Sequence, residues 1–301
     1  MASMQVSLQQ MIRVNRETRD AGNATVNVLD HGFLFGDSIY EVVRTVKRRP
    51  LAWRQHLKRL RNSAARISLE LPWTDRELEE EVETIIREAP WSDETYVRIV
   101  ITRGVGKIEL IPTTCAEPML IVIGKPLLPA PPEFYERGVV LCVTEVRRNS
   151  RHAMDPGIKS GNYLNNVLAV IEAQKKGAQD ALMLNEHGHL TECTTSNIFL
   201  VSHGIVRTPS LDCGILAGIT RETLLELMRQ VAIPSEETEL TLKDLRAADE
   251  VFMSGTVKGV VPVSSVIGEV DWRSGPRPLT ARIRSLYECH IGLADDSKGG
   301  A

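Results

Sequence analysis

The chain has 301 residues, of which 43% are hydrophobic and 25% charged, and its formal net charge is −3 at pH 7. This composition is ordinary for a globular protein, and the slightly negative charge excludes the basic surface that is typical of nucleic-acid-binding proteins. The five cysteines form no CxxC pair and no apolar run reaches the length of a membrane span, so we expect no disulfide framework, metal site or transmembrane helix. The N-terminus lacks the apolar stretch of a secretory signal, and a cytoplasmic protein is therefore expected.

Two helices and two strands are predicted in the first part of the chain. The segment 56–71 has apolar residues at helical spacing, at Leu57, Leu60, Ala64, Ile67 and Leu71. A second helix is predicted to begin at Thr74, because Glu77 completes a capping box. Its inward-facing residues are Leu78, Val82, Ile85 and Ile86. Two runs rich in β-formers, 95–103 and 119–124, are predicted to be strands.

A proline-rich segment, 124–134, is the best candidate for a linker, because prolines disfavour both helices and central strands. It divides the chain into an N-terminal domain, 1–123, and a C-terminal domain, 135–301. The second domain is predicted to contain a strand at 139–146, a helix at 162–177 that Gly177 ends, strands in two hairpins at 180–192 and 197–207, helices at 220–231, 241–247 and 279–289, and a strand at 250–254. This mixture of strands and amphipathic helices predicts an α+β fold.

Lys159 lies in the segment IKSGNYLNN, a glycine-containing loop in front of a predicted helix. A lysine that is buried there can lose its proton and attack a carbonyl group, which is the chemistry of Schiff bases. Most lysines are simply solvated, and Lys258 in the glycine-rich turn SGTVKG is a rival. The residues alone do not decide between the two lysines.

Three further motifs offer groups that could bind a phosphorylated aldehyde. Glu192 lies at the end of a predicted strand in TECTTSNIF, and GITRET places Ile219 and Thr220 at a helix start. Phosphate recognition needs backbone amides at a helix N-terminus and a positively charged side chain. Arg59 in QHLKRL could supply the positive charge. Each group also has an ordinary explanation: a solvent-facing hairpin glutamate, a capping threonine, and one more charge on a basic helix face.

Taken together, these motifs resemble the fold-type IV family of pyridoxal-phosphate enzymes. The resemblance extends from DHGFLFGDSIYEVVR (30–44) to FMSGTVKGVVPV (252–263). The family includes branched-chain aminotransferases, D-amino-acid aminotransferases, (R)-amine transaminases and aminodeoxychorismate lyases. The resemblance implies the two-domain architecture of D-amino-acid aminotransferase, with pyridoxal 5'-phosphate at the domain interface, and a homodimer.

The resemblance also implies roles for particular residues. The pattern I-K-S-G-N-Y-L makes Lys159 the catalytic lysine that forms the Schiff base, and Glu192 the partner of the pyridine nitrogen, which must stay protonated in an electron sink. Arg59 is implied as the phosphate-binding cation. The other implied cofactor contacts are Tyr163, Ser196, Asn197, Leu216, Gly218, Ile219, Thr220 and Thr256. Tyr163 follows Lys159 by four residues, and we expect the two on the same helical side.

The substrate signals are mixed. Tyr96 and Arg98 form a Y-x-R pattern similar to the carboxylate-binding strand of branched-chain aminotransferases, and alternate residues of a strand share one face. The loop TRGVGKIELIP is similar to archaeal branched-chain enzymes and lacks the arginine-x-histidine pattern of D-amino-acid aminotransferases. Val42 and Phe35 stand where branched-chain enzymes usually have glycine and often tyrosine, which favours the D-specific or (R)-amine branch. The expected substrate contacts are Phe35, Tyr40, Val42, Tyr96, Arg98, Val257 and Lys258.

We therefore predict a transaminase that moves an amino group between a branched-chain L-amino acid and 2-oxoglutarate by a ping-pong mechanism. A D-amino-acid or (R)-amine transaminase is the first alternative, an aminodeoxychorismate lyase the second, and a non-enzymatic binding protein of the same fold the third. The expected partners are small molecules, namely amino acids and 2-oxo acids, and a second copy of the chain, with no nucleic acid and no membrane.

Overall fold

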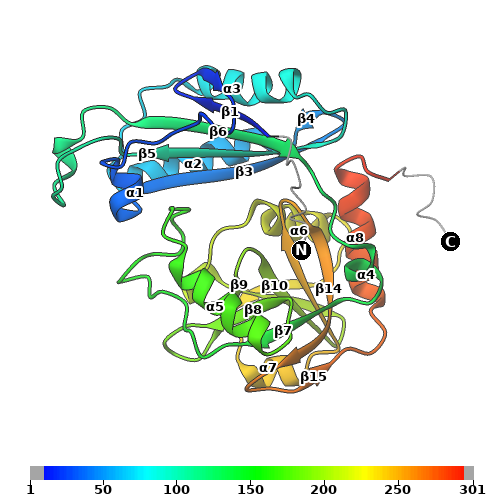
Figure 1. Cartoon of the computed structure of the whole chain (residues 1–301). Coiled ribbons are helices and arrows are strands. Elements are labelled where there is room, and N and C mark those ends of the chain that lie inside the picture. Colours follow the sequence, from blue (N-terminus) through cyan, green and yellow to red (C-terminus); the bar gives the residue numbers. More distant parts are fainter. Residues whose placement is uncertain (1–9, 295–301) are drawn as a thin grey trace, which may run out of the picture. The chain divides into compact units, whose positions relative to one another are not determined.

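The computed structural model describes residues 10–294, which form two compact units (Figure 1). The first unit comprises the described residues up to Leu128 together with Lys159–Asn162, and the second comprises Pro129–Ile158 and the described residues from Tyr163 onward. The division between Leu128 and Pro129 falls inside the proline-rich segment 124–134. The chain thus returns from the second unit to the first for four residues, beginning at Lys159.

The first unit is built on a six-stranded antiparallel sheet in the order β2-β1-β6-β5-β3-β4. The strands are β1 (Met11–Val14), β2 (Glu17–Arg19), β3 (Ser38–Val46), β4 (Arg49–Pro50), β5 (Thr95–Thr102) and β6 (Met119–Pro126). Helices α2 (Trp53–Arg66) and α3 (Asp75–Glu88) pack against β3 and β6. Alternate residues of β5 are buried, among them Val97 and Ile99, and belong to the core that the helices cover, so the residues between them lie on the other face.

The first of the two helices is shorter than the sequence predicts. Leu57, Leu60 and Ala64 are buried as expected, but the helix ends at Arg66. Ser68 has a positive φ of 51°, which turns the chain out of the helical path, so Leu71 packs on the core from outside the helix. The second helix agrees with the prediction, because Thr74 and Glu77 form the capping box.

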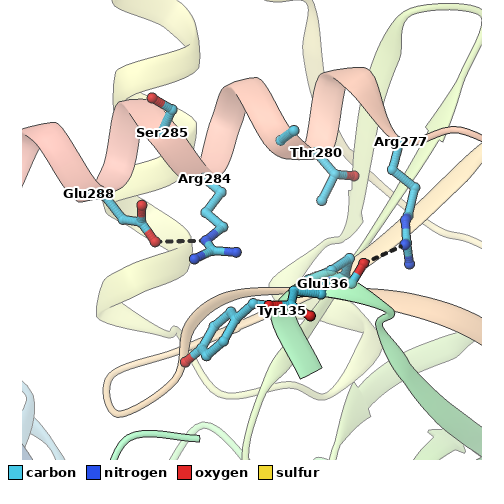
Figure 2. A pocket seen from close by; sticks show the side chains of 9 residues that line it. Tyr135, Glu136, Arg277, Thr280, Arg284, Ser285 and Glu288 are labelled. Atoms are coloured by element: carbon cyan, nitrogen blue, oxygen red, sulfur yellow. Dashed lines mark hydrogen bonds and ion pairs between the residues drawn. The ribbon is translucent and has the colours of Figure 1, made fainter. Parts of the chain in front are cut away.

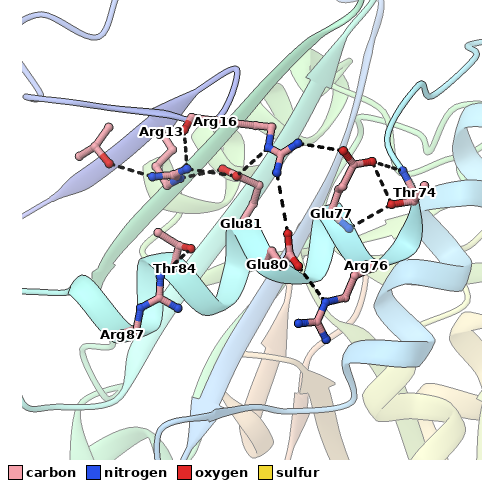
Figure 3. Close-up of polar contacts among 10 residues, drawn as sticks. Arg13, Arg16, Thr74, Arg76, Glu77, Glu80, Glu81, Thr84 and Arg87 are labelled. Carbon is pink, nitrogen blue, oxygen red and sulfur yellow. Dashed lines mark hydrogen bonds and ion pairs between the residues drawn. The ribbon is translucent and has the colours of Figure 1, made fainter.

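An ion-pair network fastens the hairpin of β1 and β2 to α3 (Figure 3). The Arg13 guanidinium donates to both oxygens of Glu81, at 2.7 and 3.1 Å. Arg16 donates to Glu77 at 2.8 Å and lies 3.8 Å from Glu80. Glu81 is only 3% exposed, so its pair with Arg13 is a buried one, whereas the others are at the surface and contribute little.

The second unit is built on a nine-stranded mixed sheet in the order β12-β11-β10-β13-β14-β7-β8-β9, with β15 beside β14. The additional pairing of β9 with β10 closes six of these strands into a ring. The strands are β7 (Val139–Val143), β8 (Asp180–Leu184), β9 (Leu190–Cys193), β10 (Asn197–Ser202), β11 (Ile205–Pro209), β12 (Ser235–Thr238), β13 (Glu250–Gly255), β14 (Gly259–Ile267) and β15 (Trp272–Arg273). The closed pairing brings the end of β9, the start of β10 and the end of β13 together.

The helices complete an α+β fold. Besides α2 and α3, the first unit has the short helix α1 (His31–Phe35) and a 3₁₀ turn at Pro112–Thr114. The second unit has α4 (Pro132–Glu136), α5 (Leu164–Lys175), α6 (Ile219–Gln230), α7 (Leu242–Arg246), α8 (Pro278–His290) and a 3₁₀ turn at Leu211–Cys213. Gly177 follows α5 with a φ of 81°, the left-handed conformation that a helix-ending glycine provides. The five cysteines are free. Among residues 10–294, none of the helices has both the length and the apolar character needed to cross a membrane.

Candidate active site

Lys159 is fixed by its backbone against the sheet of the first unit. The Tyr40 amide donates to the Lys159 carbonyl at 2.9 Å, and the Gly161 amide donates to the Ser38 carbonyl at 2.8 Å, so the segment pairs with the start of β3. The Lys159 amide donates to the Ser63 hydroxyl of α2 at 3.2 Å. A Cβ at Gly161 would lie 2.1 Å from Ser38 Oγ, so a larger residue there would force the Ser38 hydroxyl to move. The lysine is therefore held by two elements distant in sequence.

The side chain of Lys159 meets the predicted substrate residues on the face of the sheet that α2 and α3 do not cover. Its Nζ donates to Tyr40 Oη at 3.3 Å and lies 4.4 Å from the centre of that ring. The Arg98 guanidinium lies 4.0 Å from the same ring centre, and Val42 pairs with Arg98 across the strands. Tyr96 shares this face, and Lys125 Nζ lies 4.8 Å from the centre of its ring. Lys159 and Arg98 thus place two cationic side chains against the Tyr40 ring, and this local positive charge suits the binding of a carboxylate.

Among residues 10–294, no contact is found between Phe35 and the cluster of Lys159, Tyr40 and Arg98. It lies at the end of α1, where its ring meets His31 edge-on with the centroids 4.9 Å apart.

Arg59 lies on the opposite face of β3 and is not a solvated helix charge. Its Nε and Nη2 donate to the two oxygens of Glu41, at 2.7 and 2.8 Å, and the Arg59 side chain is 11% exposed. Burial raises the pKa of Glu41, but the hydrogen bonds and charge of Arg59, together with His56, outweigh burial and lower the pKa of Glu41 to about 2. Sequence analysis misses Glu41 and His56 because both lie at spacings that any strand and helix would tolerate.

Glu192 is the centre of a second cluster, in the second unit. It is 5% exposed, which excludes a solvent-facing glutamate at the hairpin end. Arg148 donates to Oε1 from Nε at 3.1 Å and lies 3.0 Å from it through Nη2, while Oε2 accepts from Asn197 Nδ2 at 3.3 Å and from the Leu216 amide at 3.1 Å. This ring of donors suits an ionised carboxylate. Arg148 escapes sequence analysis, although its position shortly after a buried strand is a usable signal.

The N-terminus of α6 lies close to Asn197 of the second cluster. Gly218 is its N-cap and makes no side-chain capping bond. Ile219 and Thr220 begin the helix, as the sequence predicts, and both are buried. A Cβ on Gly218 would lie 1.9 Å from Asn197 Oδ1, so glycine is required for Asn197 to hold Glu192. Uncapped amides and the helix dipole together favour a bound phosphate.

The end of β13 completes the second cluster. Ser254 pairs with Asn197 across the strands, and its buried hydroxyl has no hydrogen-bond partner among residues 10–294. Ser196 lies beside Gly255, where a Cβ would be 3.3 Å from Ser196 Oγ. The turn between β13 and β14 holds Thr256, Val257 and Lys258. This turn is tied down because the Tyr135 hydroxyl donates to the Lys258 carbonyl at 2.9 Å.

The geometry bears on two further expectations. Lys258 Nζ lies 4.0 Å from Asp180 Oδ2, so the rival lysine has a carboxylate beside it. The expected helical relation between Lys159 and Tyr163 is wrong, because α5 begins only at Leu164 and Tyr163 is its N-cap. Lys159 therefore precedes the helix, in a segment whose conformation the sheet pairing sets.

A cavity of about 430 Å³ lies elsewhere in the second unit, between α8 and α4 (Figure 2). Arg277, the N-cap of α8, and Arg284 of α8 line it together with Tyr135 and Glu136 of α4. Arg277 donates to the carbonyls of Glu136 and Arg137, and Arg284 donates to Glu288. None of the predicted site residues lines this cavity.

The chain is similar to several known proteins of one family. The family model described as "Amino-transferase class IV" matches residues 38–266. The chain is 37% identical over 277 residues to a Methanocaldococcus jannaschii protein named "Putative branched-chain-amino-acid aminotransferase", covering 92% of this chain and 95% of that one. It is 33% identical over 292 residues to the D-alanine aminotransferase of Listeria monocytogenes, covering 92% and 94%. A solved T.th. branched-chain amino acid aminotransferase complexed with N-(5'-phosphopyridoxyl)-L-glutamate superposes with a TM-score of 0.84 at 28% identity, covering 96% of each chain. The chain belongs to the class IV aminotransferases and has their fold-type IV architecture.

Proposed function

We propose that the protein is a pyridoxal-phosphate-dependent transaminase that moves an amino group between a branched-chain L-amino acid and 2-oxoglutarate by a ping-pong mechanism. The observation that carries the proposal is the position of Lys159, whose Nζ and the Arg98 guanidinium both lie against the Tyr40 ring. One face of one sheet thus presents an amine that can attack a carbonyl group and a cation that can bind a substrate carboxylate.

The residues present fit the cofactor. Glu192 is a buried carboxylate ringed by donors, the N-terminus of α6 has no side-chain cap, and the buried Ser254 hydroxyl is without a hydrogen-bond partner in the described part of the chain. We assign the pyridine nitrogen to Glu192 and the phosphate to Arg59, Ile219, Thr220 and Thr256. Covalent attachment is assigned to Lys159.

The chemistry then divides between cofactor and chain. When bound, pyridoxal phosphate supplies an aldehyde that accepts the amino group and a pyridinium ring that withdraws electrons. Lys159 Nζ would take the α-proton of the amino acid and deliver it to the aldehyde carbon of the bound cofactor, and the Tyr40 hydroxyl at 3.3 Å would orient that nitrogen. The Glu192 carboxylate would accept a hydrogen bond from the protonated pyridine nitrogen of the cofactor. Arg148 and Asn197 hold the carboxylate in place, because each donates to one of its two oxygens.

Substrate class rests on the strand face around Arg98. The Y-x-R strand, the M. jannaschii relative and the solved structure with the glutamate adduct favour an L-amino acid with a dicarboxylic oxo-acid. Val42 pairs directly with Arg98, and its side chain occupies space on this face of the sheet that a glycine would leave open. This difference, together with the similarity to D-alanine aminotransferase, favours a D-amino-acid or (R)-amine transaminase as the second candidate function. We further propose that the enzyme is a cytoplasmic homodimer.

A substrate panel tests the proposal. Purified holoenzyme is mixed with L-leucine, L-isoleucine, L-valine, D-alanine or (R)-1-phenylethylamine, and the absorbance change of the bound cofactor is followed without an acceptor. The proposal predicts faster half-reactions with the branched-chain L-amino acids. Faster reaction with D-alanine or the (R)-amine contradicts it, and pyruvate release from aminodeoxychorismate would identify a lyase.

A further inference from the structure

A buried polar cluster joins β3 to α2 in the first unit. Glu41 is 0% exposed, while its neighbours Tyr40 and Val42 lie on the opposite face of the strand, with Arg98. The Glu41 carboxylate accepts from Arg59 Nε and Nη2 at 2.7 and 2.8 Å, and lies 2.7 Å from His56 Nδ1. Three contacts thus satisfy a carboxylate that has no access to water.

The same helix face reaches the catalytic lysine. His56, Arg59 and Ser63 lie at positions i, i+3 and i+7 of α2, so they form one polar stripe. Ser63 accepts the Lys159 amide at 3.2 Å. Replacing a buried ion pair by apolar residues of similar volume is often neutral or stabilising, so stability alone does not account for a carboxylate here.

We propose that Glu41 is the positioning residue for Arg59, holding the guanidinium in the orientation in which it binds the cofactor phosphate. This inference rests on the proposed function, in which Arg59 is the phosphate-binding cation. The bidentate clamp fixes the plane of the guanidinium, so less rotamer freedom is lost when the phosphate binds. Burial lowers the pKa of His56, so His56 remains neutral and supports Glu41 without placing a second positive charge beside Arg59.

The test replaces Glu41 by glutamine, which has nearly the same size and shape. The glutamine NH₂ group is a hydrogen-bond donor, so it cannot accept the hydrogen bonds that Arg59 and His56 donate to Glu41. Cofactor affinity is measured by absorbance titration of the apoprotein, and the environment of the phosphate by ³¹P NMR of the holoenzyme. We expect Glu41→Gln to weaken cofactor binding by about tenfold or more and to shift the phosphate resonance. In an Arg59→Ala background the same substitution should cause no further loss of affinity, because nothing remains to be positioned.

Glu81 provides the matched control, because it is a buried carboxylate in the same unit that accepts two bonds from an arginine, Arg13 (Figure 3). Glu81→Gln should lower thermal stability yet leave cofactor affinity and the phosphate resonance unchanged. Equal loss of affinity in both variants would show that Glu41 is merely structural, and full affinity in Glu41→Gln would overturn the proposal. If Glu41→Gln does not fold, Arg59→Lys takes its place. Arg59→Lys keeps the positive charge but lacks the planar guanidinium that Glu41 holds, so its affinity for the cofactor should fall as much as in Glu41→Gln. Undiminished cofactor affinity in Arg59→Lys would contradict the positioning role of Glu41.

The two proposals fail in different ways. If the parent protein binds no pyridoxal phosphate, or Arg59→Ala binds it as tightly as the parent, the proposed role of Arg59 is wrong. If Arg59→Ala loses the cofactor and Glu41→Gln does not, only the positioning role of Glu41 is wrong.

Discussion

Glu192 is the residue whose substitution tests the electron-sink chemistry most selectively. Glu192→Gln keeps the size of the side chain and can still accept from Arg148, so the cofactor should be retained. A neutral amide does not stabilise a pyridinium charge, and we expect α-proton removal to slow by at least about 10²-fold. Stopped-flow absorbance with L-leucine measures this rate.

Glu250 supplies a control in the same unit. It is also a buried glutamate, and it accepts the amides of Leu279 and Thr280. Glu250→Gln should leave the proton-transfer rate at the parent value. Parent-like activity in Glu192→Gln would require another partner for the pyridine nitrogen.

Arg98 is expected to discriminate between the two half-reactions. Arg98→Ala removes the cation beside Tyr40, so KM for 2-oxoglutarate should rise about tenfold or more while the leucine half-reaction stays nearly intact. Lys125→Ala removes the neighbouring cation over Tyr96 and should have a small effect on both. Equal loss in both half-reactions would show that Arg98 binds the α-carboxylate or is structural.

At the residue scale, sequence analysis singles out candidate groups more readily than the residues that contact them. Lys159 and Glu192 lie in local strings of residues, and such strings are visible in the sequence. Arg148 and Glu192 are 44 residues apart, and Arg59 and Glu41 are 18 apart, so their pairing depends on strand register and helix packing. No local pattern encodes those two quantities.

At the scale of elements, the start of α6 makes a steric prediction. Gly218→Ala places a Cβ 1.9 Å from Asn197 Oδ1, which must move and weaken its bond to Glu192. We expect a loss of about 1–3 kcal/mol in the free energy of unfolding, together with weaker cofactor binding. Thermal unfolding and cofactor titration measure the two effects.

Gly275 is a suitable control, because a Cβ there would have no other atom of the described chain within 4 Å. Gly275→Ala should leave both quantities unchanged. A stable Gly218→Ala variant with parent affinity would show that the approach of Gly218 to Asn197 is not required.

The elements that sequence patterns predict well are those with strong local signals. The capping box of α3 and the glycine after α5 are found where expected. Strand β14 is not predicted, and it contains Pro262 opposite Phe252, a residue type that local rules exclude from central strands. The strand persists because pairing with both β13 and β7 outweighs the missing amide, and a register shift follows at Val263.

At the scale of the whole molecule, burial of Glu41 and His56 predicts sensitivity to acid. The pKa of His56 is lowered by burial, so its stabilising contribution is complete above pH 6.5 and falls as the pH drops below that value. The pKa of Glu41 falls from 4.5 to about 2, so its contribution is complete above pH 4.5 and is lost as the pH falls toward 2. The Glu41 shift corresponds to about 3 kcal/mol.

Thermal unfolding followed by circular dichroism between pH 8 and pH 2 checks this dependence. Glu41→Gln should be less stable at pH 7 and lose less stability between pH 4.5 and pH 2 than the parent. An identical acid profile for the two proteins would show that Glu41 does not control it.

The division of the molecule into units is partly visible in the sequence. The proline-rich segment contains the boundary between Leu128 and Pro129. The return of Lys159–Asn162 to the first unit is not visible, because it depends on pairing between Ser160 and Ile39, which are far apart in the sequence. The proposed catalytic lysine, Lys159, therefore lies where the chain passes from the second unit to the first, and only the fold shows this.

Borohydride reduction tests the central claim most directly. The holoenzyme is reduced, digested and mapped by mass spectrometry for the phosphopyridoxyl label. We predict that the label is on Lys159, and that Lys159→Ala still binds the cofactor through its phosphate contacts but does not turn over. A label on Lys258, or no labelled peptide at all, would contradict the assignment of Lys159.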